Sequence, residues 1–296
     1  MTYMPILELS DRADLSSVRR RGRIGDRKNA ALINRLAVRL THRLSRAPRI
    51  SVLGEYNSGK SALINVLIGT SVLPTSVDAN TRMPVRIFQS ARPTLAIELS
   101  DRERFDVCAD QLDPSLLENA SMLHVGLPLS RLESFELVDT PGLASGDPRM
   151  CERAMETCRQ SHLAIWCSTA TQAWKASELG VWQSLPKRLR SNGILAVTFK
   201  DTIESAEDEG RLWSRINAEA APHFKKVVMV SARDGIAARQ IADSVESDRL
   251  WSVSGAAELS NAVDDMVSKL IMKRVRGAEQ LLHSAMSGNA RDALFA

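Results

Sequence analysis

The chain has 296 residues, of which 44% are hydrophobic and 25% charged, so it can form one large α/β domain with accessory helices or two small domains. No run reaches the roughly 18 apolar residues of a membrane-spanning helix, and acidic residues stand near the amino terminus where a secretory signal would be basic and then apolar. We therefore expect a cytosolic protein. The four cysteines have neither zinc-site spacing nor the density of a disulfide framework, and we expect them to be reduced and buried.

Residues 1–48 read as a basic helical arm. Residues 1–50 contain 12 Arg and Lys against four acidic residues, a net charge of +8, whereas the rest of the chain has a net charge of −4. One face of the predicted helix is apolar and is formed by Leu32, Leu36, Leu40 and Leu44. Another face is basic and is formed by Arg35, Arg39 and Arg43.

The start of this arm, from Arg19 to Lys28, is rich in arginine. Such a cluster can bind an anionic membrane surface or an acidic partner. It has no interleaved aromatic residues to stack bases, which makes nucleic acid a less favoured partner. The alternative is a solvated arm with no partner.

The centre of the chain, residues 49–240, alternates between strands and helices. Short apolar runs predict buried strands at residues 49–53, 134–138, 163–167, 194–198 and 227–230, and helices are predicted at 60–67, 149–159 and 176–189. This order predicts an α/β three-layer sandwich with a mainly parallel sheet.

The tail, residues 241–296, is predicted to be helical. Its apolar residues follow helical spacing over several turns, at Val263, Met266, Val267, Leu270, Ile271, Val275, Ala278, Leu281 and Leu282. Two amphipathic helices therefore flank the central region.

A phosphate-binding loop follows the first predicted strand. The pattern G-x-x-x-x-G-K-S runs from Gly54 to Ser61 and leads directly into a helix. Its glycines let backbone N–H groups approach phosphates, Lys60 reaches the β and γ phosphates, and the Ser61 hydroxyl ligates Mg²⁺. The predicted nucleotide-binding residues here are Gly54, Asn57, Ser58, Gly59, Lys60, Ser61 and Ala62.

A second motif, Asp139-Thr140-Pro141-Gly142, follows the strand at 134–138. Asp139 then lies at a strand end where it can hold Mg²⁺, and the Gly142 N–H can reach the γ-phosphate. Taken by itself, an Asp before Pro-Gly is an ordinary turn. After a phosphate loop it favours a nucleotide site.

These motifs resemble the translation-factor-like class of GTPases and, within it, the G domain of dynamin-like proteins, over roughly residues 49–233. The segment from Leu73-Pro74 to Thr81-Arg82-Met83-Pro84 is similar to the dynamin switch segment. The resemblance implies that Thr81 ligates Mg²⁺ with Ser61 and Asp139. The alternative is a polar loop that contains a threonine by chance.

The resemblance also implies GTP as the nucleotide. The family has Asn/Thr-Lys-x-Asp after the fifth strand, and this chain has Thr198-Phe199-Lys200-Asp201. Asp201 can accept hydrogen bonds from guanine, and the Phe199 ring can stack on the base in place of the usual lysine. The loop Ser231-Ala232-Arg233 is similar to the family's last base-contacting loop.

The catalytic assignment is less direct. Leu143 stands where small GTPases have a water-positioning glutamine. Asn57 resembles the asparagine of Era-type and TrmE-type GTPases, which helps hold K⁺ beside the phosphates. We therefore predict Lys60, Asn57 and Thr81 as the catalytic residues, with K⁺ or dimerisation through the G domain as assistance; alternatively, Asn57 only caps the loop.

The favoured function is a dynamin-like GTPase that hydrolyses GTP to GDP and phosphate to drive assembly or conformational change. Resemblance to dynamins implies that the flanking helices pair as a neck, that the protein is a homodimer or hetero-oligomer, and that it can lie peripherally at a membrane. Two alternatives remain open: an Era-like or TrmE-like GTPase acting on RNA or ribosomes, and a nucleotide-binding scaffold with negligible turnover.

Overall fold

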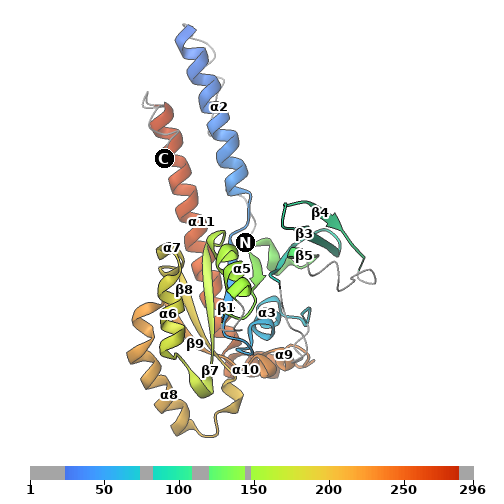
Figure 1. The fold of residues 1–296 in the computed structure, drawn as a ribbon, viewed down its shortest axis with the longest axis vertical. Helices are drawn as coiled ribbons and strands as arrows, with labels where there is room; N and C mark the ends of the chain where they lie inside the picture. The colour runs from blue at the N-terminus through green and yellow to red at the C-terminus, as the bar shows by residue number, and fades with distance from the viewer. Residues whose placement is uncertain (1–23, 74–82, 109–119, 144–147, 287–296) are drawn as a thin grey trace. The chain divides into compact units, whose positions relative to one another are not determined.

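The computed structural model describes residues 24–73, 83–108, 120–143 and 148–286 (Figure 1). It divides into two compact units, one formed by residues 48–266 and the other by the described parts of residues 1–47 and 267–296. Within these described ranges, no helix combines the length and apolar character needed to cross a membrane.

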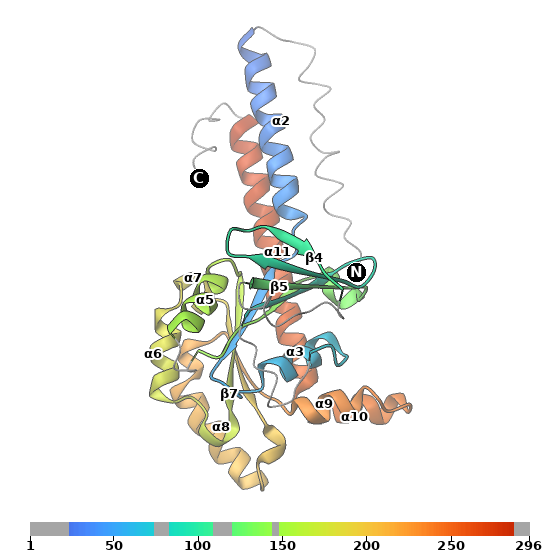
Figure 2. The ribbon, with the colours of Figure 1, turned by 45° about the vertical axis from the view of Figure 1, so that its right-hand side comes forward.

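A mainly parallel sheet forms the centre of the larger unit (Figures 1 and 2). Its order is β4-β3-β5-β2-β6-β1-β7-β8-β9, with parallel pairing from β6 through β9 and antiparallel pairing of β2 with β6 and of β3 with β4 and β5. The strands are β1 (Arg49–Gly54), β2 (Val85–Gln89), β3 (Thr94–Leu99), β4 (Arg104–Asp106), β5 (Ala120–Leu127), β6 (Glu136–Asp139), β7 (Leu163–Thr169), β8 (Gly193–Thr198) and β9 (Lys226–Met229). The predicted α/β class is confirmed.

The central strands form because their side chains are apolar on both faces. Every residue of β8 is buried, and so is every residue of β1 after Arg49. Strand β5 instead alternates between buried and half-buried residues, as expected where one face is less covered. Strands β2 to β5 were not predicted, because none of them is a continuously buried apolar run: β4 is exposed throughout, and β2, β3 and β5 are only partly buried.

Helices surround this sheet (Figure 1). They are α3 (Lys60–Ile68), α5 (Pro148–Arg159), α6 (Ala176–Ser184), α7 (Lys187–Arg190), α8 (Ala206–Glu219), α9 (Ala232–Ala238) and α10 (Ser244–Val253). The single helix predicted at 176–189 is wrong. Leu185 is extended, with ψ 150°, because Pro186 disfavours helical geometry in the residue before it, so the segment splits into α6 and α7.

The smaller unit is a helical pair, formed by α2 (Ile24–Leu44) and the later part of α11 (Ala256–Met286), which lie side by side in Figures 1 and 2. Leu36 and Leu40 of α2 pack with Ala278 and Ala285 of α11. Arg274 of α11 also donates hydrogen bonds to the backbone carbonyls of Arg43 and Arg46. The apolar side of α2 is thus covered within this unit.

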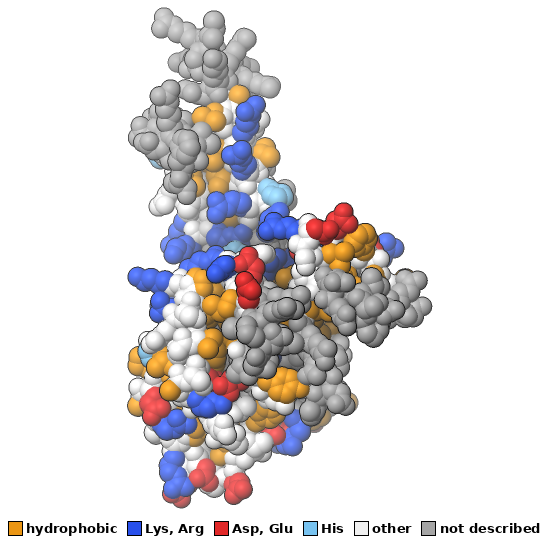
Figure 3. Space-filling model, in the orientation of Figure 1, with side chains coloured by type: hydrophobic (Ala, Val, Ile, Leu, Met, Phe, Trp, Pro, Cys, Tyr) orange, Lys and Arg blue, Asp and Glu red, His pale blue; other side chains and the backbone are white. Residues whose placement is uncertain are grey.

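The solvent-exposed side of α2 is basic. Arg35, Arg39 and Arg43 are exposed, and Lys and Arg side chains gather over this unit in Figure 3. Residues 19–23 of the predicted basic cluster lie outside the described residues. The expectation that the cysteines are reduced and buried holds for Cys158 and Cys167, which are free and buried. It is wrong for Cys108, which is free but exposed. The Cys151 side chain lies outside the described residues.

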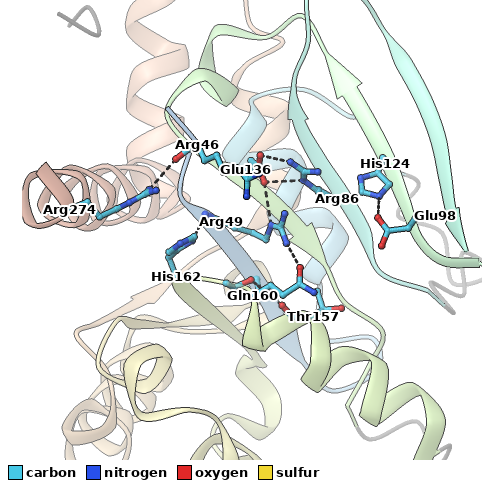
Figure 4. A network of polar contacts seen from close by, with 12 residues as sticks. Arg46, Arg49, Arg86, Glu98, His124, Glu136, Thr157, Gln160, His162 and Arg274 are labelled. Carbon is cyan, nitrogen blue, oxygen red and sulfur yellow. Dashed lines mark hydrogen bonds and ion pairs between the residues drawn. The ribbon is translucent and has the colours of Figure 1, made fainter. Parts of the chain in front are cut away.

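A polar network joins the amino-terminal ends of β1 and β6 to β2 (Figure 4). Glu136 accepts hydrogen bonds from Arg86 at 2.6 and 3.0 Å and from Arg49 at 3.3 Å. Burial favours a raised pKa for Glu136, but the hydrogen bonds and charges of Arg86 and Arg49 outweigh it and lower that pKa. The network joins three neighbouring strands near the end of β1 that lies opposite the phosphate loop.

Candidate nucleotide-binding site

The phosphate loop connects β1 to α3 and depends on unusual backbone angles. Gly54 has φ 148° and Gly59 has φ 82°, both in a region that favours glycine. A Cβ on Gly54 would lie 2.3 Å from the Cys167 carbonyl oxygen, so strand β7 permits no side chain there. Asn57 is also left-handed, with φ 58°, and its exposed side chain makes no hydrogen bond to the described residues.

Lys60 lies at the start of α3 and is 8% exposed. Its ammonium donates to the backbone carbonyl of Glu55 at 2.7 Å and to that of Gly54 at 3.4 Å. Burial lowers the pKa of Lys60, and the charge of Asp139 partly opposes this effect. A desolvated ammonium beside the first N–H groups of a helix is well placed to bind phosphate.

Half-buried Ser61 and buried Asp139 form a pair of oxygen ligands. The Ser61 hydroxyl donates to Asp139 Oδ2 at 2.5 Å, while Asp139 Oδ1 is buried without a hydrogen-bond partner in the described part of the chain. Burial raises the pKa of Asp139 to about 6, although Ser61 and Lys60 act in the opposite direction. An unpaired buried carboxylate oxygen next to a hydroxyl fits a hard divalent cation such as Mg²⁺.

The segment after Asp139 lies against the phosphate loop. A Cβ on Gly142 would come within 2.9 Å of the Tyr56 backbone, and the Leu143 N–H donates to the Gly54 carbonyl at 3.1 Å. The Leu143 side chain is 7% exposed and belongs to the hydrophobic core. It therefore contributes packing rather than a polar group to the site.

The predicted base-recognition residues follow β8. The Thr198 hydroxyl donates to the Ser58 carbonyl at 2.8 Å, which joins the end of β8 directly to the phosphate loop. Phe199 is left-handed, with φ 57°, and its ring is 39% exposed beside Gly59. A bulky residue in this conformation is strained, and strain of this kind concentrates at functional sites.

Lys200 and Asp201 belong to a short 3₁₀ turn, η5 (Lys200–Thr202). The Lys200 ammonium contacts the Val253 carbonyl at 3.1 Å and Glu209 at 3.2 Å, so its side chain is engaged with neighbouring helices. The Asp201 side chain is 10% exposed and lies 3.4 Å from a nitrogen of Arg233. This contact brings together two of the predicted base-binding loops.

The last of these loops begins α9. The Ser231 hydroxyl caps that helix by accepting from the Asp234 N–H at 3.1 Å. The Lys200 N–H donates to the Val230 carbonyl, which ties this loop to the one that follows β8. Ala232 is half-buried, whereas Arg233 is exposed.

The site residues thus form two groups that Thr198 connects. The phosphate group contains Gly54, Asn57, Ser58, Gly59, Lys60, Ser61, Ala62, Asp139 and Gly142, and the base group contains Thr198, Lys200, Asp201, Ser231, Ala232 and Arg233. Thr81 lies outside the described residues.

Two contacts that support the phosphate group were not predicted. Glu55, inside the loop, pairs with Lys175 and accepts from the Ser177 hydroxyl at 3.3 Å. Asn65 of α3 binds the backbone of Val72 and Leu73 through three hydrogen bonds of 2.8 to 3.0 Å. These contacts join residues distant in sequence or in separate loops, and periodicity carries no signal for them.

The fold and the phosphate loop define a P-loop protein of the GTPase type. A family profile described as the dynamin family matches residues 50–198. A curated relative, "Dynamin-like protein 2" of Campylobacter jejuni, is 28% identical over 202 residues, covering 66% of this chain and 32% of its own length. An uncharacterised protein of Caldicellulosiruptor is 27% identical over 132 residues, covering 41% of this chain and 33% of its own.

The fold is also found in solved structures. A chain from an oligomerised bacterial dynamin pair, described as a mechanism for long-range sensing and tethering of membranes, aligns over 97% of this chain and 47% of its own, with a TM-score of 0.69 and 16% identity. A second chain described in the same terms aligns over 97% of this chain and 55% of its own, with a TM-score of 0.68 and 15% identity. The protein belongs to the dynamin family of GTPases, and it spans about a third of the length of the curated relatives that it matches.

Proposed function

We propose that this chain binds GTP with Mg²⁺ and hydrolyses it to GDP and phosphate, and that its nucleotide state drives assembly or conformational change. The observation that carries the proposal is the cluster of buried Lys60 and Asp139 with half-buried Ser61, in which one Asp139 carboxylate oxygen has no hydrogen-bond partner among the described residues. Desolvating these groups is unfavourable, and a bound phosphate and cation would compensate for it.

The residues have distinct roles in this proposal. Lys60 and the first N–H groups of α3 bind the phosphates, and Ser61, Asp139 and Thr81 hold the cation. Mg²⁺ neutralises charge on the phosphates when it is bound. Asp201 selects guanine through its hydrogen-bond acceptors, and the exposed ring of Phe199 stacks on the base.

Positioning of the attacking water needs a group other than Leu143, whose side chain packs in the core. We propose that Asn57 assists catalysis in another way, by helping to hold a K⁺ that supplies positive charge beside the phosphates, with or without dimerisation through the G domain, because its side chain is exposed in the loop. Turnover measured in KCl, NaCl and choline chloride tests the cation: it should be fastest in KCl for the wild type and equal in all three for Asn57→Ala. Equal wild-type rates would remove K⁺ from the proposal.

Phosphate release from GTP tests the enzyme activity itself, at several protein concentrations so that assembly is included. We expect Mg²⁺-dependent release by the wild type and a loss of about 100-fold or more for Lys60→Ala. Lys226→Ala is the matched control, because Lys226 is a half-exposed lysine of the same unit, paired with Glu258. Equal, negligible release by the wild type and Lys60→Ala would favour a nucleotide-binding scaffold.

Assembly and membrane contact are further parts of the proposal. The family and the oligomerised bacterial dynamin pair support self-association through the G domain or association with another chain. The arginine-rich region Arg19–Lys28 is the part of the chain that we propose to bind anionic lipid or an acidic partner, which would place this cytoplasmic protein at the periphery of a membrane. Sedimentation with anionic liposomes should exceed retention on RNA, and the reverse would favour an Era-like role.

A further inference from the structure

Arg233 contacts the carboxylate to which the proposed function assigns guanine recognition. A guanidinium nitrogen of Arg233 lies 3.4 Å from Asp201 Oδ2. The two partners differ in accessibility, because the Arg233 side chain is 72% exposed whereas that of Asp201 is 10% exposed. The carboxylate is therefore fixed in the fold, and the guanidinium is the partner with freedom to move.

The guanidinium and the guanine edge offer the same donors. Guanine presents its N1–H and its 2-amino group from two nitrogens bonded to one carbon, and the guanidinium presents N–H groups from nitrogens that also share one carbon. Both match a carboxylate in geometry and donor number. Arg233 contacts one oxygen of Asp201, Oδ2, and a base that pairs with both carboxylate oxygens would compete with Arg233 for that oxygen.

Arg233 has a second carboxylate within reach. Its Nε donates to Asp234 Oδ1 at 3.1 Å, in the same first turn of α9. Asp234 and, to a smaller extent, Asp201 raise the pKa of Arg233, so the group stays charged. The guanidinium can leave Asp201 and keep an ion pair with Asp234, which makes its displacement inexpensive.

We infer that Arg233 is a guanine-mimicking gate: it pairs with Asp201 when no nucleotide is bound, and the incoming base displaces it from Asp201 so that it keeps only its pair with Asp234. The inference rests on the proposed function, since it requires guanine to bind at Asp201. Its consequence is that Arg233 lowers the affinity for guanine nucleotides, although a positive side chain near a triphosphate would ordinarily raise it.

Nucleotide affinities of the wild type and three variants test this gate. In Arg233→Ala we expect GTP and GDP to bind about two- to fivefold more tightly, the range of exposed ion pairs. In Asp234→Asn the guanidinium loses its alternative partner, so binding should weaken by a similar factor. In the double variant, Asp234→Asn should have no further effect, because the group that it redirects is gone.

Controls separate the gate from a general effect of charge. Arg249→Ala removes another exposed arginine of the same unit, paired with Glu246 on α10, and should leave affinity unchanged. Raising the ionic strength weakens the Arg233–Asp201 pair, so the difference between wild type and Arg233→Ala should shrink in high salt. Thermal unfolding temperatures show whether each variant is folded.

The results that would overturn the gate can be told apart. Equal GTP affinity of the wild type and Arg233→Ala would contradict the gate alone. Weaker binding by the variant would also contradict it, and would show that Arg233 supports the base. Absence of GTP binding by both proteins would contradict the proposed function and the gate with it.

Discussion

At the phosphate end of the site, Lys60 and Asp139 are buried, and the backbone around Gly54 leaves no room for a side chain. At the base end, Phe199 and Arg233 are exposed, and only the carboxylate of Asp201 is largely enclosed. Buried polar groups tolerate few replacements, because each one needs a partner. Exposed groups can be exchanged at small cost, which agrees with the departure from the family motif at Phe199.

The largest expected effect is at Gly54. A Cβ there meets the Cys167 oxygen at 2.3 Å and the Ser58 hydroxyl at 2.5 Å, so Gly54→Ala must displace strand β7 or the loop. We expect the free energy of unfolding to fall by about 4 kcal/mol and nucleotide binding to be lost. Gly69 is the control, because it also has a positive φ, of 83°, but a Cβ added there would meet no atom within 4 Å.

Chemical denaturation of the two alanine variants measures this difference. Gly69→Ala should lose only about 1 kcal/mol, the usual strain of a left-handed alanine. Equal losses in the two variants would show that backbone strain, rather than the close approach of β7, determines the need for glycine.

The next effect concerns the charge of Asp139. Its pKa in the folded protein is about 6, above the ordinary value of 3.8, so the folded state holds this proton more tightly than the unfolded chain does. The associated stability is fully present below about pH 4 and is lost as the pH rises through 6. The loss amounts to about 3 kcal/mol at pH 7 in the absence of Mg²⁺ and nucleotide.

Asp139→Asn tests this pH dependence, because the amide is neutral and of the same size. In denaturation series between pH 4 and pH 7 without Mg²⁺, the variant should be the more stable protein at pH 7, and the difference should vanish near pH 4. The variant should also lose Mg²⁺-dependent hydrolysis. A difference that does not change with pH would show that Asp139 is not the titrating group.

The smallest effect is expected at the base end. Phe199→Ala removes a stacking ring and should weaken GTP binding about tenfold without changing stability, and Phe199→Lys should recover part of the loss. Phe105→Ala, which removes another exposed ring from β4, is the control. Unchanged GTP affinity in Phe199→Ala would place the base elsewhere and weaken the contrast between the two ends.

Burial also explains which parts of the fold could be predicted from the sequence. Strands such as β1 and β8 were predicted because they are continuously apolar, and the phosphate loop because its glycines and lysine have fixed spacing. Strands β2 to β5 were not predicted, since strands that are only partly buried or fully exposed have a weaker apolar pattern. Within residues 176–189, Pro186 is the residue that marks the division into two helices, because it disfavours helical geometry in the residue before it.

Side-chain pairing could not be predicted in the same way. The contact of Arg233 with Asp201, like that of Lys175 with Glu55, joins separate loops, and only the folded backbone brings them together. The burial that shifts the pKa of Asp139 is also a property of the fold, although the residue itself could be identified from its motif.

The central claim is that this site binds guanine nucleotides through Asp201, and nucleotide competition tests it most directly. A labelled GTP analogue bound to the wild type should be displaced by GTP at concentrations at which ATP and XTP have no effect, and Asp201→Asn should lose this preference and gain affinity for XTP. ATP that competes as well as GTP with the wild type would contradict the claim.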